Sequence, residues 1–186
     1  MPAGQKKIYL TFDDGPHPEI TPKVLQILSD YQVKATFFCV GQNVEKYPET
    51  YQNILSSGHL TGNHTFNHSK GWKVSLNDYL DNTAKAAKLI RSDYFRPPHG
   101  RITFRQICAL KKQYKIVMWT VLSYDFDKET LPEVCLSYVL KHAKDGSIIV
   151  FHDSEKAKKN MLFALPQVLE KFTRQGFTFE RLDGIN

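Results

Sequence analysis

The sequence predicts an α/β fold, a distorted and incomplete (β/α) barrel of about seven strands. Short apolar runs alternate with amphipathic stretches along all 186 residues, and unusual polar residues follow several of the runs directly. Alternation this regular indicates a parallel sheet with right-handed crossovers. A doubly wound open sheet is the competing architecture. The length suits a single domain that spans residues 1–186.

The expected strands are the apolar runs. In chain order they are KIYLTF (7–12), KATFFCVG (34–41), the weaker HLTGN (59–63), SDYFRP (92–97), KIVMWTVLS (115–123), SIIVFH (147–152) and FTFERL (177–182).

The expected helices lie between these runs. They cover Ile20–Tyr31, Val44–Ser56, Leu76–Ile90, Thr103–Tyr114, Leu131–His142 and Met161–Arg174. Pro132 is typical of a helix start, and Gly176 is typical of a helix stop. The last stretch repeats apolar residues at helical spacing, namely Leu162, Leu165, Val168, Leu169 and Phe172.

The composition excludes several classes of protein. With 41% hydrophobic and 24% charged residues, the chain is neither disordered nor membrane-spanning. The net charge of +6 is scattered, without the aromatic interleaving of a nucleic-acid surface. The chain enters its first strand almost at once, so we expect a protein that stays in the cell or one from which a targeting segment was removed. Cys39, Cys108 and Cys135 lack paired spacing and are expected to be free thiols.

Polar residues collect where the expected strands end. In a (β/α) barrel, chemistry is carried by the carboxyl ends of the strands. A shared position of this kind indicates one reaction site. The residues are Asp13, Asp14, His64, His68, Arg96, His99, Asp125, Asp127, His152 and Asp153.

Asp13 and Asp14 end the first strand as a doubled carboxylate. Neighbours in a continuing strand face opposite sides, but Gly15 and Pro16 break the strand, so both carboxylates can turn toward one site. Two like charges need a compensating cation. A divalent metal held by one carboxylate would supply it and leave the other ionised as a base. This reasoning leaves open which aspartate binds the metal.

His64 and His68 are spaced i, i+4, which on a helical turn places both imidazoles on one face. With one aspartate they form a two-histidine, one-carboxylate set that leaves positions free for water and substrate. Arg96 is expected to hold Asp13 and keep it charged. His152 becomes a competent acid if a carboxylate such as Asp125 occupies its far nitrogen.

These residues lie in five motifs that resemble, in order, those of the polysaccharide deacetylases of the NodB-homology type, carbohydrate esterase family 4. The motifs are TFDDGP, HTFNH, RPPHG, WTVLSYDF and VFH, and the resemblance extends over roughly residues 7–181. It implies a NodB-like distorted barrel forming one catalytic domain. It also implies a metal-dependent amidase that removes acetyl groups from N-acetylglucosamine units in peptidoglycan or a chitin-like glycan.

The resemblance also assigns roles. It implies that Asp14, His64 and His68 bind the metal, commonly zinc, with cobalt, nickel or manganese as other candidates. Asp13 is then the general base, oriented by Arg96, and His152 is the general acid, tuned by Asp125. The backbone N–H of His99 is implied to stabilise the oxyanion. The expected substrate-binding residues are Pro98, His99, Gly100, Phe126 and Val150, of which the last two would line a pocket for the acetyl methyl group.

The sequence departs from the family pattern at three positions. His99 stands where the family usually has Tyr or Phe, Leu122 replaces the first Asp of a DxxDW motif, and Phe126 replaces its Trp. These changes do not affect a backbone oxyanion donor. They are expected to affect the substrate preference.

Two other functions compete with N-deacetylation. An esterase that removes O-acetyl groups, as from acetylxylan, could use the same residues. A non-catalytic carbohydrate-binding relative would be favoured by loss of Asp13, a metal ligand or His152, and none is lost. The expected partner is an N-acetylated glycan, with no nucleic acid and no membrane span, and a monomer is expected.

Overall fold

The computed structural model describes residues 6–185. Its strands are β1 (Lys6–Asp13), β2 (Thr36–Cys39), β3 (Leu60–Asn63), β4 (Tyr94–Phe95), β5 (Lys115–Ile116), β6 (Val121–Leu122), β7 (Ser147–His152) and β8 (Phe177–Glu180). Its α-helices are α1 (Ile20–Asp30), α2 (Gly41–Lys46), α3 (Pro48–Ser56), α4 (Leu76–Ala87), α5 (Phe104–Leu110), α6 (Pro132–His142) and α7 (Lys158–Arg174). Short 3₁₀ helices cover Gly71–Lys73, Pro98–Gly100 and Leu182–Gly184.

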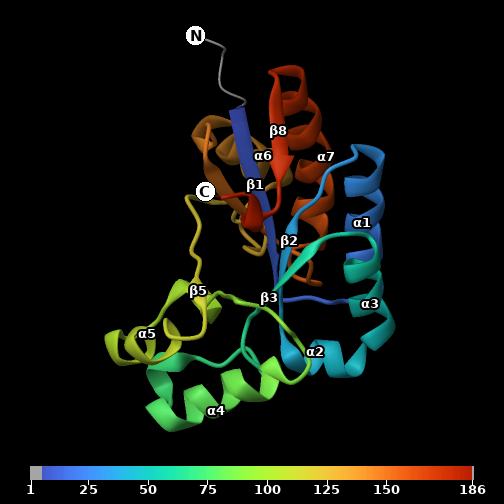
Figure 1. The fold of residues 1–186 in the computed structure, drawn as a ribbon. Coiled ribbons are helices and arrows are strands. Elements are labelled where there is room, and N and C mark those ends of the chain that lie inside the picture. The colour runs from blue at the N-terminus through green and yellow to red at the C-terminus, as the bar shows by residue number, and fades with distance from the viewer. Residues whose placement is uncertain (1–5, 186) are drawn as a thin grey trace.

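The strands form one curled parallel sheet in the order β5-β4-β3-β2-β1-β7-β6. Strand β8 pairs with the first half of β1 and lies beside it in Figure 1. Strand β1 is central, although it comes first in the chain. Among the described residues no pairing joins β5 to β6, so the barrel is open at this point. The expected incomplete (β/α) barrel is therefore confirmed.

One expected strand is divided. The run 115–123 forms β5 at one edge of the sheet and β6 at the other, and residues 117–120 cross the opening between them. Periodicity does not reveal this break, because the crossing residues are as apolar as the strands. The strand expected from the fifth run is thus two short strands, and the described sheet has eight.

The helices follow the expected order with one correction. The helix predicted over Val44–Ser56 is two helices, because α2 ends at Lys46 and Pro48 starts α3. Proline disfavours helical backbone in the residue before it, and Tyr47 accordingly has ψ 59°. Pro132 occupies the first turn of α6, and Gly176 adopts φ 79° after α7, both as expected.

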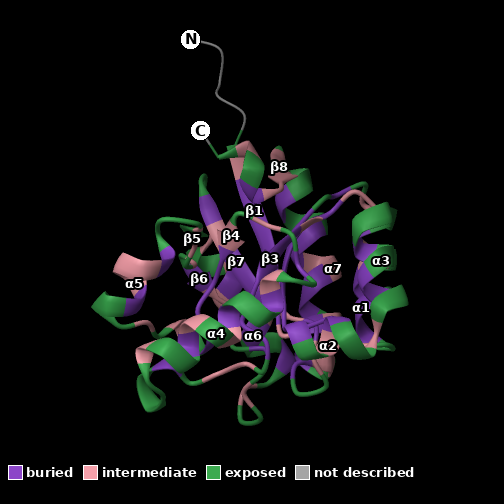
Figure 2. Cartoon of the chain, turned by 60° about the horizontal axis from the view of Figure 1, so that its bottom comes forward, coloured by how far each residue is buried: buried purple, intermediate pink, exposed green. Residues whose placement is uncertain are grey.

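The alternation of β1 explains how a carboxylate reaches the barrel interior. Ile8, Leu10 and Phe12 belong to the main hydrophobic core beneath the helices. Thr11 and Asp13 take the opposite face and are buried inside the barrel. Helices α1 and α7 pack together on the outer face (Figure 1), and the buried residues follow the strands (Figure 2).

Two further expectations concern the cysteines and membrane-spanning helices. All three cysteines are free thiols, and Cys39 and Cys135 are buried. Within residues 6–185, no helix has the length and apolar character needed to cross a membrane.

Candidate active site

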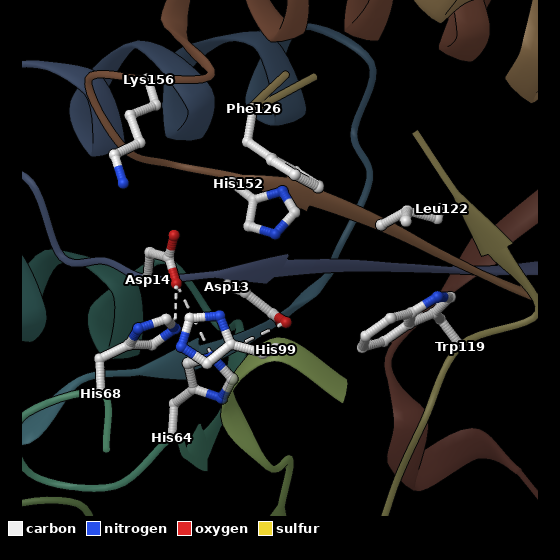
Figure 3. A pocket seen from close by; sticks show the side chains of 10 residues that line it. All are labelled: Asp13, Asp14, His64, His68, His99, Trp119, Leu122, Phe126, His152 and Lys156. Carbon is white, nitrogen blue, oxygen red and sulfur yellow. Dashed lines mark ion pairs between the residues drawn. The ribbon is translucent and has the colours of Figure 1, made fainter. Parts of the chain in front are cut away.

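The polar strand ends meet around one cavity of about 180 Å³. It lies at the carboxyl ends of the strands, the position where parallel α/β barrels carry their chemistry. The side chains that line it are Asp13, Asp14, His64, His68, His99, Trp119, Leu122, Phe126, His152 and Lys156 (Figure 3).

Asp13 and Arg96 form a buried ion pair. The Arg96 Nη1 lies 2.7 Å from Asp13 Oδ1 and also donates to the Thr11 hydroxyl. Its Nε and Nη2 donate to the carbonyls of Val117 and Met118, in the segment that crosses the barrel opening. Burial lowers the pKa of Arg96, and the Asp13 carboxylate opposes that shift. The arginine thus ties Asp13 to the segment that crosses the barrel opening.

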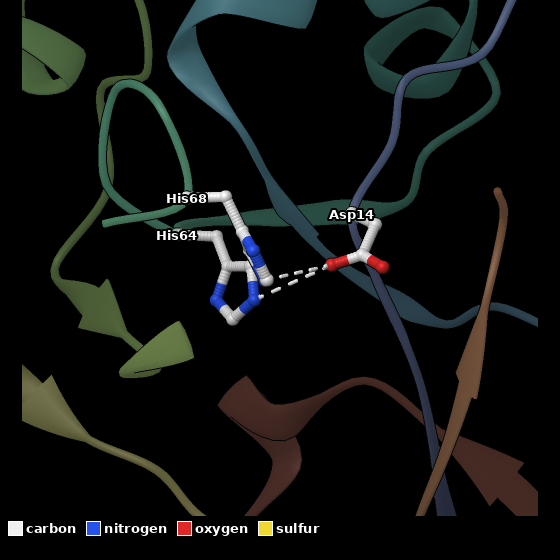
Figure 4. Close-up of side chains that lie close together, drawn as sticks. All are labelled: Asp14, His64 and His68. Atoms are coloured by element: carbon white, nitrogen blue, oxygen red, sulfur yellow. Dashed lines mark ion pairs between the residues drawn. The ribbon is translucent and has the colours of Figure 1, made fainter. Parts of the chain in front are cut away.

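Asp14 lies in a different environment, although it is the next residue. Its φ of 82° places it outside strand geometry, and the Asn43 amide holds its carbonyl at 2.7 Å. Its Oδ1 lies 3.1 Å from His68 Nε2 and 3.7 Å from His64 Nε2 (Figure 4). Burial alone would raise the pKa of Asp14, but the hydrogen bond from His68 and the charges of the neighbouring histidines lower it well below its usual range.

The two histidines lie on a loop, and the expectation of a helical turn is wrong. Residues 64–68 follow β3 without helical hydrogen bonding, and both Thr65 and His68 have positive φ. Side chains fix this loop instead. Asn63 Oδ1 accepts from the Thr65 N–H, and Asn82 Oδ1 accepts from the N–H of Phe66. The imidazoles still converge, because their ring centres are 5.1 Å apart.

His64 is prepared as a neutral ligand. Its Nδ1 lies 2.7 Å from the Arg96 carbonyl, which can only accept, so Nδ1 carries the proton and Nε2 presents a lone pair to the cavity. Burial lowers the pKa of His64 to about 4, which keeps the ring neutral at neutral pH. A hydrogen bond of this kind fixes the tautomer of a metal-binding histidine.

The donor set fits a divalent metal. One ligand atom from each of Asp14, His64 and His68 lies within 4.8 Å of the others. Ligand bonds of about 2.0–2.2 Å in tetrahedral geometry separate ligand atoms by about 3.3 Å, and the two distances to Asp14 Oδ1 are close to that value. Three protein ligands leave a coordination position free, as in catalytic zinc sites.

His152 and Asp125 form a second charged pair, with His152 at the end of β7 and Asp125 in the turn that follows the adjacent strand β6. Asp125 has no exposed surface and binds His152 twice, at 2.7 Å from its Nδ1 and 2.7 Å from its backbone nitrogen. Burial acts to lower the pKa of His152, but the Asp125 carboxylate outweighs it and raises the pKa to about 9. A protonated imidazole therefore faces the cavity.

A buried carboxylate supports the turn that carries Asp14, and the sequence predicts no role for it. Asp153 accepts hydrogen bonds from the Gly15 N–H and the Thr21 hydroxyl. A Cβ at Gly15 would come within 2.1 Å of this carboxylate, so only glycine fits there. Burial raises the pKa of Asp153 to about 7. The one feature of the sequence that could have pointed to Asp153 is its position directly after His152.

Some of the expected substrate-binding residues line the cavity, and others do not. His99 lines the cavity, whereas Pro98 is buried and Gly100 lies against the Trp119 ring without lining it. Among the described residues, no backbone hydrogen bond is donated by the N–H of His99. Phe126 packs against His152 at 4.9 Å between ring centres and lines the cavity as expected.

The expectation that Val150 lines the acetyl pocket is wrong. Val150 has no exposed surface, because it lies one layer deeper in the barrel than His152 on the same face of β7. Its partner across the register, Leu122 on β6, reaches the cavity instead. Trp119 and Lys156 also line it, and neither was predicted. Asp127 does not; it caps the turn before α6.

The open barrel with a two-histidine, one-aspartate set beside an unligated aspartate defines a class of metal-dependent hydrolases. Comparison with known proteins identifies the family within it. The family model for polysaccharide deacetylases matches residues 1–119, and the chain belongs to this family.

Two curated relatives act on peptidoglycan. A peptidoglycan-N-acetylglucosamine deacetylase from Bacillus cereus is 35% identical, over 96% of this chain and 87% of the relative. The peptidoglycan-N-acetylmuramic acid deacetylase PdaC from Bacillus subtilis is 33% identical, over 93% of this chain and 37% of the relative.

The fold has a similar solved structure. The crystal structure of the Bc1960 peptidoglycan N-acetylglucosamine deacetylase superimposes with a TM-score of 0.93 at 31% identity. The match covers 99% of this chain and 89% of that chain.

Proposed function

We propose that this protein is a metal-dependent deacetylase that removes N-acetyl groups from an N-acetylglucosamine-containing glycan, with peptidoglycan as its substrate. The observation that carries the proposal is the separation of two adjacent aspartates. Asp14 lies against two histidines, whereas Asp13 is held by Arg96. One carboxylate can therefore bind a metal while the other stays free to accept a proton.

Asp14, His64 and His68 would hold the metal. Bound there, a divalent ion would polarise a carbonyl and, if it is zinc, would lower the pKa of a bound water from about 15.7 to about 7. The identity of the metal is part of the proposal, and zinc suits the nitrogen and oxygen donors.

Asp13 acts as the general base in this mechanism. It has 3% of its surface exposed, and Arg96 occupies only its Oδ1. The second oxygen, Oδ2, is 3.9 Å from His64 Nε2, beside the metal ligands. Oδ2 can therefore accept a proton from a water that attacks the acetyl carbon.

His152 and the backbone of His99 complete the reaction. The attack places negative charge on the acetyl oxygen, and the uncommitted N–H of His99 can donate to it. His152, held protonated by Asp125, donates its Nε2 proton to the departing amine. Amide hydrolysis needs this protonation, because an unprotonated amine is a poor leaving group.

Three apolar side chains shape the acetyl pocket. Trp119, Leu122 and Phe126 line the cavity beside His152 (Figure 3). They suit a methyl group and restrict the space for a larger acyl group.

The test is acetate release from a panel of peptidoglycan, chitooligosaccharides and acetylxylan, using protein stripped of metal and then reloaded with zinc, cobalt, nickel or manganese. We expect release from the first two substrates, loss of release on chelation, and recovery on reloading. Preference for acetylxylan would favour the O-acetyl esterase. Full activity in protein verified to be metal-free would overturn the proposed mechanism.

A further inference from the structure

A second concavity lies beside the active site and carries exposed apolar side chains. We call it the side groove. It has a volume of about 380 Å³ and lies between the 3₁₀ helix Gly71–Lys73 and the start of α5. Trp72, Val74 and Phe104 line it and are 38%, 40% and 79% exposed. Large apolar side chains gathered at one exposed place mark a binding surface more often than single ones do.

A row of packed rings links the side groove to the active-site cavity. The His99 ring packs against the metal-ligand candidate His68 at 4.5 Å and against Trp72 at 5.4 Å between ring centres. His99 lines the active-site cavity, and Trp72 lines the side groove. A chain-like substrate that leaves the cavity on this side therefore meets Trp72 next.

The side groove is preformed. Gln106 is 2% exposed, donates its amide to the Gly71 carbonyl at 2.9 Å, and accepts from the Thr103 N–H at 2.9 Å. It thus joins the two walls of the groove. A Cβ at Gly71 would come within 2.8 Å of the Tyr79 ring, so the wall that carries Trp72 is packed closely against α4. A preorganised wall loses little conformational entropy when it binds.

The surroundings of the side groove are positively charged. Four exposed basic residues lie on its two walls or next to them: Lys70, Lys73, Arg101 and Arg105. Among the described residues none of the four takes part in an ion pair, whereas Lys158 pairs with two glutamates. The Arg101 guanidinium lies 5.2 Å from the Trp72 ring. Unpaired cations beside aromatic rings suit a sugar chain that bears carboxylates.

We propose that the side groove binds the next sugar units of the glycan that is deacetylated, with pyranose rings stacked on Trp72 and Phe104 and with substituent carboxylates near Arg105. The inference rests on the proposed function and deepens it, because it names an extended, anionic glycan as the ligand. The apolar faces of pyranose rings pack on aromatic side chains, and the sugar hydroxyls remain in water.

The first experiment measures kcat/KM on neutral chitooligosaccharides from the dimer to the hexamer for the wild type, Trp72→Ala and Phe104→Ala. We expect wild-type kcat/KM to rise with length, and each variant to lose about fivefold or more on the hexamer, with a loss that shrinks as the substrate shortens. Phe104 does not contact His99 in the row of rings, so its variant separates binding from any disturbance of the active site. Val134→Ala, at a 54% exposed site on α6, is the matched control.

The second experiment compares peptidoglycan with the neutral hexamer for Arg105→Gln, and we expect kcat/KM to fall on peptidoglycan alone. Equal losses at every chain length, or none, would overturn the stacking role. Equal behaviour of Arg105→Gln on both substrates would overturn the preference for an anionic glycan. A change in oligomeric state of Trp72→Ala without a change in kinetics would make the groove a contact between copies. If the wild type released no acetate from any length, the proposed function itself would fail.

Discussion

The buried floor of the active site and its exposed rim are held in place by different forces. The floor consists of Asp13, Arg96, Asp125 and His152, joined in two charged pairs with 2.7 Å contacts. The rim consists of His99, Phe126, Lys156 and Trp72. The three aromatic side chains are held by ring contacts. Lys156 forms no ion pair with any other described residue.

The difference separates chemistry from recognition. A buried charge that loses its partner costs about 3–5 kcal/mol, so the floor tolerates little change. Exposed rings and ammonium groups can be exchanged without that cost. The departures from the usual family pattern at His99 and Phe126 lie on the rim, and the third, Leu122, lines the cavity wall. We therefore expect large effects from floor substitutions and substrate-dependent effects from the rim.

The largest effect is expected for Asp13→Asn, which removes the base and keeps its shape. Turnover should fall by about 10² to 10⁴-fold, while bound metal, measured by atomic emission, stays near one ion per chain. The matched variant Asp14→Asn should lose both metal and turnover. If Asp13→Asn lost the metal and Asp14→Asn kept it, the two roles would be reversed.

His152→Ala should come next and should depend on the substrate. Loss of the acid should slow N-acetyl substrates by about 10² to 10⁴-fold and slow activated acetate esters much less, because their leaving groups depart without a proton. Equal losses on both substrates would contradict the acid role.

The same residue predicts the alkaline limb of the wild type. Asp125 raises the pKa of His152 to about 9, so the ring is protonated below that pH and activity should fall as the pH rises through it. A bound cation lowers this pKa, because like charges disfavour protonation, so the limb should lie at or below about pH 9 in the metal-loaded enzyme. A kcat profile from pH 6 to 11 measures it.

Gly15→Ala tests the rigidity of the turn that follows Asp14, beside the floor, without replacing a charged group. The added Cβ would come within 2.1 Å of the Asp153 carboxylate, and overpacking of this kind typically costs about 1–3 kcal/mol. Chemical denaturation should show that loss, together with weaker metal binding, since Asp14 lies on the same turn. An unchanged metal affinity would mean that the turn adapts to the added methyl group and is softer than its contacts indicate.

The smallest effect is expected for His99→Tyr on the rim. Its backbone N–H remains, so the variant should stay within about tenfold of wild-type turnover, as exposed substitutions generally cost little. The ranking of substrates should change, because the ring lies between the cavity and Trp72. A loss as complete as that of Asp13→Asn would place His99 in the floor.

Much of the fold and site could be predicted because parallel strands end at one edge. The shared position of Asp13, His64 and His152 after apolar runs follows from local sequence. The pairing of β6 with β7 brings Asp125 to the Nδ1 of His152, which is the contact expected from the sequence for a competent acid.

Other features depend on tertiary geometry that no local pattern carries. The apolar run 115–123 does not reveal that it crosses the barrel opening. Thr65 and His68 have positive φ, so the segment does not form the expected helical turn. Neither residue is glycine, so the sequence does not signal this conformation. The burial of Val150 and the exposure of Lys156 to the cavity depend on depth within the barrel, which periodicity along one strand does not report.

The central place of β1 also affects how the protein is made. The Thr11 hydroxyl bonds to the Ile149 carbonyl, 138 positions later in the chain, and β8 pairs with the first half of β1 later still. Closing loops of this length is slow and cannot begin until the last part of the chain is available. During synthesis, β1, which ends at Asp13, must wait for β7 with one of its edges uncovered. A chain that stops after α6 contains Asp14, His64 and His68 in its sequence, yet we expect it to aggregate because β1 is left exposed.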